Sequence, residues 1–163
     1  MSGTVSRRAL LTGRVQPTLR SPLPPGITEA GLEACTGCSA CVSVCPTHIV
    51  VMEEGRPRLD FSKGECLFCG ACADACPEPV FPTRRPPTFD HIVRISDSCL
   101  AMRGVACMTC RDACPSTAIR FRPRTGAPFL PEIQGESCTG CGACIAPCPV
   151  GAIGVAAKET VDA

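Results

Sequence analysis

The sequence predicts an α+β fold of two tandem halves, each built from short strands and short helices around a cysteine-rich centre. Two observations predict it. The 163 residues include 16 cysteines, which fall into four groups of four along the chain. Short apolar runs lie between these groups, and they are too brief for helices and rich in β-branched residues, as strands are. A four-fold repeat of this kind indicates one small structural unit used four times.

The composition gives little material for a core of packed side chains. The chain has no Trp, no Tyr and six Phe, against 15 Gly and 17 Pro. A chain with so few large side chains is poorly equipped to become rigid by packing alone. The cysteines are the residues numerous enough to supply the missing rigidity.

The chain divides into five segments. Residues 1–30 contain no cysteine and several prolines, and the first 20 carry four arginines and no acid, so we expect a basic arm that is extended or disordered. The best boundary is the stretch 77–87, which has five prolines and two adjacent arginines. The segments expected after the arm are a first half at 31–78, a Pro/Arg-rich joint at 79–90, a second half at 91–157 and a tail at 158–163.

The four cysteine groups share one spacing, and each ends in Cys-Pro. Groups one, two and four read C-x2-C-x2-C-x3-C-P, and group three reads C-x7-C-x2-C-x3-C-P because residues 100–106 lengthen its first loop. In chain order the groups are Cys35, Cys38, Cys41, Cys45; Cys66, Cys69, Cys72, Cys76; Cys99, Cys107, Cys110, Cys114; and Cys138, Cys141, Cys144, Cys148.

Each group is flanked by apolar runs that we expect to be strands. The C-x3-C stretches fit one or two helical turns, so the repeated unit is predicted to be strand, cysteine loop, short helix, strand. The expected strands that follow a group are 49–52, 80–81, 118–121 and 152–155, and those that precede one are 59–61, 92–95 and 129–133.

Three kinds of chemistry could use sixteen cysteines. A disulfide framework needs an oxidising compartment, and it does not require this repeated spacing. A structural zinc site normally takes two C-x2-C hooks that lie a dozen or more residues apart, whereas here three cysteines follow one another at three-residue steps. The spacing C-x2-C-x2-C-x3-C-P is that of bacterial ferredoxins with two iron–sulfur clusters. The sequence therefore predicts four [4Fe–4S] clusters, with the clusters forming much of the core of tandem two-cluster ferredoxin-like units.

The spacing also predicts which cysteines act together. A cubane has iron at four corners, so one tight loop can cap three of them, and the fourth cysteine of a run reaches the neighbouring cluster. The predicted sites are site one, Cys35, Cys38, Cys41 and Cys76; site two, Cys45, Cys66, Cys69 and Cys72; site three, Cys99, Cys107, Cys110 and Cys148; and site four, Cys114, Cys138, Cys141 and Cys144.

Other functions find little support in the sequence. A formal net charge of +1 gives no nucleic-acid footprint, and no run of 18 apolar residues predicts a membrane span, so a soluble protein is expected. His48 and His91 have no partner motif and are expected to be exposed or simply packed. No nucleotide-binding or catalytic motif is present, so no enzymatic role is expected.

An arginine pair near the start of the chain invites comparison with an export signal. Residues 6–11 read SRRALL, like the core of a twin-arginine signal. The residues that follow, TGRVQP, contain no apolar stretch of the length such a signal needs. A cytoplasmic location is therefore expected.

Taken together, these motifs resemble a known family. The start at residues 6–14, the four groups and the long loop of group three resemble the NapF-type ferredoxins of periplasmic nitrate reductase operons. The matching motifs are, in order, CTGCSACVSVCP, CLFCGACADACPE, CLAMRGVACMTCRDACP and CTGCGACIAPCPVGAI.

The resemblance implies a cytoplasmic accessory protein without enzymatic activity. Its implied partner is the catalytic subunit of periplasmic nitrate reductase, in whose maturation before export it would act by supplying electrons or clusters. The cysteine pattern alone also fits a general electron-transfer subunit of a redox enzyme complex, or a structural or sensing role for the clusters.

The metal content provides the first test. Protein purified without oxygen is expected to hold about sixteen iron atoms and sixteen acid-labile sulfides per chain, four of each for every cubane. Metal analysis and a sulfide assay measure both quantities. Stoichiometric zinc with little sulfide would contradict the prediction.

Overall fold

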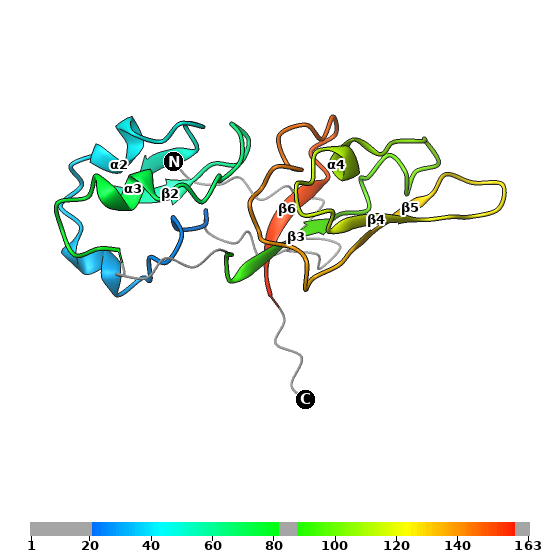
Figure 1. Ribbon diagram of the computed structural model, residues 1–163. Coiled ribbons are helices and arrows are strands. Elements are labelled where there is room, and N and C mark those ends of the chain that lie inside the picture. The colour runs from blue at the N-terminus through cyan, green and yellow to red at the C-terminus, as the bar shows by residue number, and fades with distance from the viewer. Residues whose placement is uncertain (1–20, 82–87, 159–163) are drawn as a thin grey trace, which may run out of the picture.

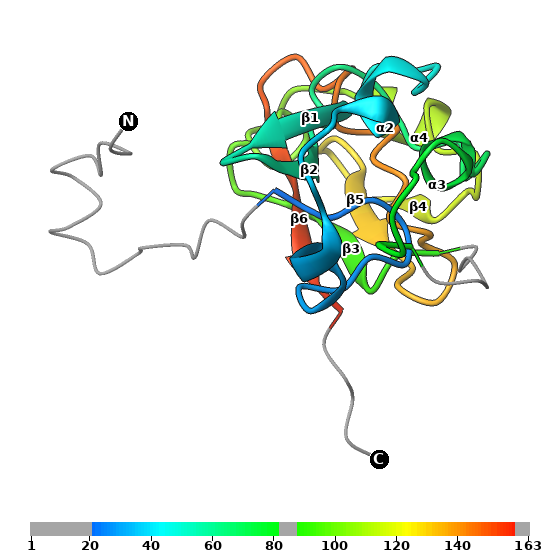
Figure 2. The same cartoon turned by 90° about the vertical axis from the view of Figure 1, so that its left-hand side faces the viewer.

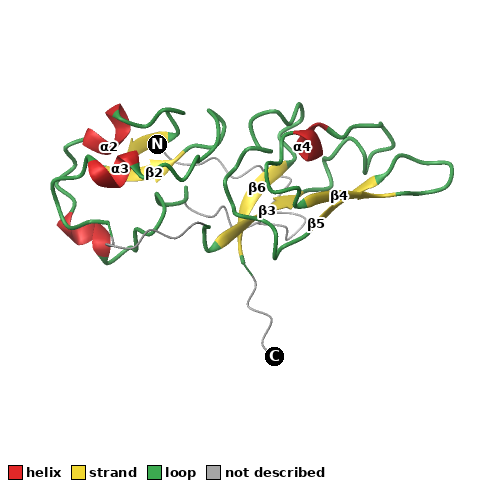
Figure 3. Cartoon of the chain, viewed as in Figure 1, coloured by secondary structure: helices red, strands yellow, loops and turns green. Residues whose placement is uncertain are grey.

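The computed structural model describes residues 21–81 and 88–158, and short elements joined by long loops dominate it (Figure 3). The arginine pair of residues 6–11 and half of the expected joint, residues 82–87, lie outside the described residues. In Figure 1 the chain forms an elongated body, with α2 (Ala40–Ser43) and α3 (Ala71–Asp74) at one end and α4 (Thr109–Asp112) toward the other. No helix within the described residues is long and apolar enough to cross a membrane.

The helices are single turns because the cysteine loops limit them at both ends. In α2 and α3 the preceding residue is left-handed, Ser39 with φ 63° and Gly70 with φ 80°, so the helix cannot extend backward. The Cys-Pro pair after each helix ends it, because proline disfavours the helical conformation of the residue before it. The expected helices are thus confirmed in groups one to three, but residues 143–147 of group four form turns only.

The strands form three separate two-stranded antiparallel sheets. These pair β1 (Val50–Glu53) with β2 (Arg56–Leu59), β3 (His91–Ile95) with β6 (Ile153–Ala157), and β4 (Ile119–Arg122) with β5 (Leu130–Ile133). In each sheet both strands come from the same side of segment 82–87 in the sequence: β1 and β2 precede it, and the strands of the other two sheets follow it. Figure 2 views the body from the end that carries α2 and α3. It shows β1 and β2 in front and β3, β5 and β6 behind them.

Two of the expected strands differ from the structure. The strand expected at 59–61 lies earlier, at β2, because Glu54 (φ 51°) and Gly55 (φ 76°) form a two-residue hairpin turn that brings Arg56 directly opposite Glu53. The prediction of a strand at 80–81 is wrong. Val80 is buried in a loop, where it packs with Ile27 and Leu32.

Part of the expected N-terminal arm is folded onto the body. Within residues 21–30, Pro24 and Ile27 are buried, and the Leu59 amide donates a hydrogen bond of 2.7 Å to the Pro22 carbonyl. Arg58, whose side chain is 10% exposed, also pairs with Glu29 at 3.0 Å. The expectation of an extended or disordered arm is therefore wrong for residues 21–30, because their apolar side chains cover the β1–β2 hairpin. Residues 1–20 lie outside the described part.

The buried core is divided into small clusters that include cysteines. One contains Ile49, Leu59 and Phe61 together with Cys45, and a second contains Ile119 with Cys110 and Cys144. Small clusters of this kind bury too little apolar surface to offset the conformational entropy of the long loops. Cys45, Cys110 and Cys144 are the buried cysteines of these clusters, and most of the other cysteines are half-buried.

This arrangement predicts that the fold depends on what the cysteines bind. Removing iron from the protein with an oxidant and a chelator is expected to abolish the cooperative thermal transition, because metal-binding free energy then supplies most of the folding free energy. Circular dichroism during heating, before and after iron removal, measures the effect. An iron-free protein that still melts cooperatively near the original temperature would contradict it.

Candidate metal centres

All sixteen cysteines are free thiols, and the structure gathers them into sets that combine different groups. Cys35, Cys38 and Cys41 share one cavity with Cys76, which comes from the end of group two. Met52, Pro57, Val80 and Phe81 provide apolar walls. The membership of this cavity is that of site one.

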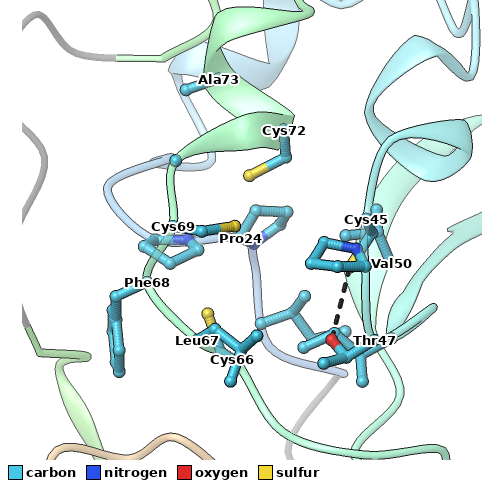
Figure 4. A pocket seen from close by; sticks show the side chains of 15 residues that line it. Pro24, Cys45, Thr47, Val50, Cys66, Leu67, Phe68, Cys69, Cys72 and Ala73 are labelled. Carbon is cyan, nitrogen blue, oxygen red and sulfur yellow. Dashed lines mark hydrogen bonds between the residues drawn. The ribbon is translucent and has the colours of Figure 1, made fainter.

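Site two is reciprocal to site one. A second cavity is lined by Cys66, Cys69 and Cys72 together with Cys45 from the end of group one. Figure 4 shows the three cysteines of group two on one segment and Cys45 facing them from another. Pro24 and Phe68 also line this cavity, so the folded part of the N-terminal segment forms one of its walls.

The second half repeats the exchange. Cys99, Cys107 and Cys110 line a third cavity with Cys148, the last cysteine of group four, and Leu100 of the long loop is part of its wall. For site four, Cys114 and Cys138 pack against the core cluster that contains Cys144, and Cys141 lies near enough to Cys144 to affect its ionisation. The cavities at sites one, two and three therefore bring together the crossed sets of side chains, whereas three of the cysteines of site four share their buried cluster with Cys110 and Cys148 of site three.

The thiols of sites one, two and three share a cavity at each site without converging on one point. Among residues 21–81 and 88–158, no group of three or more His, Cys, Asp or Glu side chains is placed to hold a metal ion. A cubane instead needs four thiolates at separate corners around a larger volume, and each of these three cavities offers four cysteine sulfurs, with Glu78 as an additional lining residue at site one. The residues present therefore fit a [4Fe–4S] cluster.

Backbone conformation shapes the cysteine loops. In groups one, two and four, the residues on both sides of the second cysteine have positive φ, as in Gly140 (φ 76°) and Gly142 (φ 81°) around Cys141. This double left-handed turn curls the loop so that its three cysteines face the same cavity. Group three lacks the turn, since Met108 after Cys107 has φ −131°. Its longer loop reaches site three by a different path.

Burial keeps four of the thiols, those of Cys66, Cys72, Cys110 and Cys144, protonated while no cation is bound. Desolvation, strengthened by neighbouring thiols, raises the pKa of Cys66 and of Cys72 to about 11. The same causes raise the pKa of Cys110 to about 11 and that of Cys144 to about 12. Iron binds thiolates, so each site must release protons as it fills, and loading is favoured as pH rises toward these pKa values.

Cys45 differs because hydrogen-bond donors surround its sulfur. Burial alone would raise the pKa of Cys45, but the Thr47 hydroxyl and the backbone amides of residues 47, 49 and 50 outweigh it, so that the pKa is lowered. The Thr47 hydroxyl lies 3.6 Å from Cys45 Sγ, as the dashed line in Figure 4 marks. These donors stabilise negative charge on sulfur, and hydrogen bonds to sulfur help to set the potential of an iron–sulfur cluster.

Equivalent contacts recur at other last cysteines. Cys114 Sγ lies 3.5 Å from the Ser116 hydroxyl and accepts a hydrogen bond from the Ala118 amide at 3.3 Å. Cys148 Sγ accepts one from the Ala152 amide at 3.3 Å. Our sequence analysis missed Thr47 and Ser116, although both follow the last cysteine as Cys-Pro-Thr and Cys-Pro-Ser and could have been found there.

The two histidines lie outside the cysteine sites. His48 is exposed, whereas His91 is half-buried and stacks on Phe89 with ring centroids 4.6 Å apart. Burial lowers the pKa of His91, which favours the neutral ring. Both positions agree with the expectation that these side chains are exposed or packed.

Comparison with known proteins agrees with this chemistry. The 4Fe-4S dicluster domain matches residues 34–80 and again residues 104–152. The second match begins beyond Cys99, which the structure nevertheless places in the wall of the third cavity. Two dicluster domains in tandem define a ferredoxin-type iron–sulfur protein with an electron-transfer role.

Individual relatives define the family more narrowly. The chain is 42% identical over 151 residues to the ferredoxin-type protein NapF of Escherichia coli strain K12, covering 91% of this chain and 92% of the relative. It is 46% identical over 133 residues to NapF of Haemophilus influenzae, covering 80% and 76%. A ferredoxin-type methylamine utilization protein, MauM of Methylorubrum extorquens, is 30% identical over 149 residues, covering 78% and 68%. The chain belongs to the NapF ferredoxin-type proteins.

Crossed sites make a specific prediction for single substitutions. Cys45→Ser is expected to disturb the cluster held with Cys66, Cys69 and Cys72 more than the cluster in its own run, because Cys45 faces the cavity of group two. Electron paramagnetic resonance of the reduced protein, compared with Cys76→Ser, can assign the altered signal. If Cys45→Ser and Cys35→Ser both removed the signal of site one and left the signal of site two intact, Cys45 would belong to the cluster of its own group. That result would contradict the crossed sites.

Proposed function

We propose that the sixteen cysteines bind four [4Fe–4S] clusters at sites one to four and that the protein carries electrons without catalysing a reaction of its own. The observation that supports this most strongly is the crossed membership of the cavities, in which the last cysteine of one group completes the set of another. A bound cluster supplies a one-electron redox centre. The chain holds it with thiolates, shields it with apolar walls and directs hydroxyl and amide donors at the sulfurs.

The distribution of charge suits two differently charged docking ends. Residues 21–81 contain three basic and eight acidic residues, whereas residues 88–158 contain seven basic and five acidic ones. Each oxidised cubane adds about two negative charges with its four thiolates. The first half then becomes strongly acidic, at about −9, while the second half reaches only about −2, because its seven basic residues exceed its five acidic ones.

We propose further that the protein works in the cytoplasm as an accessory factor. Membership of the NapF family supports a role in the maturation of the periplasmic nitrate reductase catalytic subunit before export, by electron or cluster supply. The arginine-rich residues 1–20 are a second feature that a simple carrier does not need. They offer a positively charged segment for contact with that partner.

A pull-down from anaerobic cytoplasmic extract tests the proposed role. The full chain is expected to retain the nitrate reductase catalytic subunit, and a chain lacking residues 1–20 is expected to retain less of it. Cells without the protein are expected to accumulate less active nitrate reductase. Full enzyme activity in such cells, with retention of a different redox enzyme, would instead favour a general electron-transfer subunit.

A further inference from the structure

The loop of group four is packed directly against the first half of the chain. The Cys66 amide donates a hydrogen bond of 2.8 Å to the Cys141 carbonyl, so a loop residue of group two is bonded to one of group four. The next residue, Gly142, is buried, and a Cβ atom there would lie 2.2 Å from the ring of Phe61. No side chain larger than hydrogen fits at this position unless the ring moves.

Aromatic residues are concentrated at the same contact. Three of the six phenylalanines gather there with His91: the centroid of Phe89 lies 6.1 Å from that of Phe61 and 5.1 Å from that of Phe68. The Phe89 amide also donates to the Thr139 carbonyl at 2.9 Å. Three of the six phenylalanines of this aromatic-poor chain therefore lie at the contact between its two halves.

Contacts within each half complete an order among the four sites. Helix α2, which carries Cys41 of site one, lies against α3, which carries Cys72 of site two. Cys110 of site three and Cys144 of site four belong to one buried cluster. Because Cys66 and Cys141 link sites two and four, the order along the molecule is one, two, four, three. Figure 1 agrees, since the group-four loop (orange) lies between the first half and α4.

We infer that the two halves form one continuous row of four redox centres, in which the contact of Gly142 with Phe61 holds sites two and four as neighbours. This inference rests on the proposed binding of four clusters. The ends of the row are site one, where Cys38 is exposed, and site three, where Met102 and Val105 of the long loop are exposed. A one-electron donor can therefore be oxidised at one end of the row while an acceptor is reduced at the other end. The donor and the acceptor then dock on different surfaces of the protein.

Substitution of Gly142 tests the row. Gly142→Ala is expected to remove the magnetic interaction between sites two and four in the dithionite-reduced full chain, while the interactions within each half persist as an internal reference. Electron paramagnetic resonance line shape and power saturation measure both. Gly126→Ala is the matched control, because Gly126 also has positive φ (70°) but open space around it. Spectra of Gly142→Ala and Gly126→Ala that both equal the wild type would overturn the inference.

A second substitution separates the clash from simple backbone strain. Adding Phe61→Ala to Gly142→Ala removes the ring that the new methyl group meets, so the interaction between sites two and four is expected to return in part. If the wild type holds sixteen iron atoms but shows no interaction between sites two and four, the row is contradicted and the four-cluster proposal stands. If the wild type holds clearly fewer iron atoms, the four-cluster proposal itself is contradicted.

A measurement on the wild type keeps the inference testable if Gly142→Ala does not fold. Hydrogen exchange of the holoprotein, followed by mass spectrometry, is expected to show slow exchange at the Cys66 amide because it donates to the Cys141 carbonyl. Exchange there as fast as in an exposed loop would contradict the contact between the halves.

Discussion

At sites one, two and three, the fourth thiol that lines the cavity comes from a different cysteine group than the other three, and the rest of the structure follows from this exchange. A loop of six or seven residues can face three sulfurs toward one cavity, but it cannot also surround that cavity. The chain must therefore bring a second loop to it, as Cys76 does at site one and Cys45 at site two. The one-turn helices and the Cys-Pro pairs carry the last cysteine of each group away from its own loop. The sheets β1–β2 and β4–β5 join strands that are consecutive in the chain, whereas β3–β6 pairs the first and last strands of the second half.

Burial and hydrogen bonding at these sites act in opposite directions. Burial raises the pKa of the Cys144 thiol to about 12, so this group ionises only when a cation compensates the charge. Donors at Cys45 have the opposite effect and lower its pKa although it is buried. The sites therefore combine dry, apolar walls with a few aimed N–H and O–H groups. Differences in these donors, and the separate loop path at site three, are the structural features that can give each cluster its own potential.

Local spacing carried most of the information that could be predicted. The cysteine repeat and five of the strands are visible in the sequence because each depends on residues within about one repeat. The loop at Val80 and the folded segment around Pro24 were not visible, because apolar residues in both are buried by contacts with distant parts of the chain. The contact of Gly142 with Phe61 was missed for the same reason. Its sequence signal, a glycine inside a cysteine loop, equally fits a simple turn.

Anomalous diffraction at the iron edge would test the crossed sites most directly. Crystals of protein purified without oxygen are predicted to show four separate iron clusters, each bounded by three cysteines of one group and the last cysteine of its neighbour. The cluster beside Cys66, Cys69 and Cys72 is predicted to contact Cys45 Sγ. Iron density enclosed by the four cysteines of a single group, such as Cys66 to Cys76, would contradict the exchange from which this account of the fold is built.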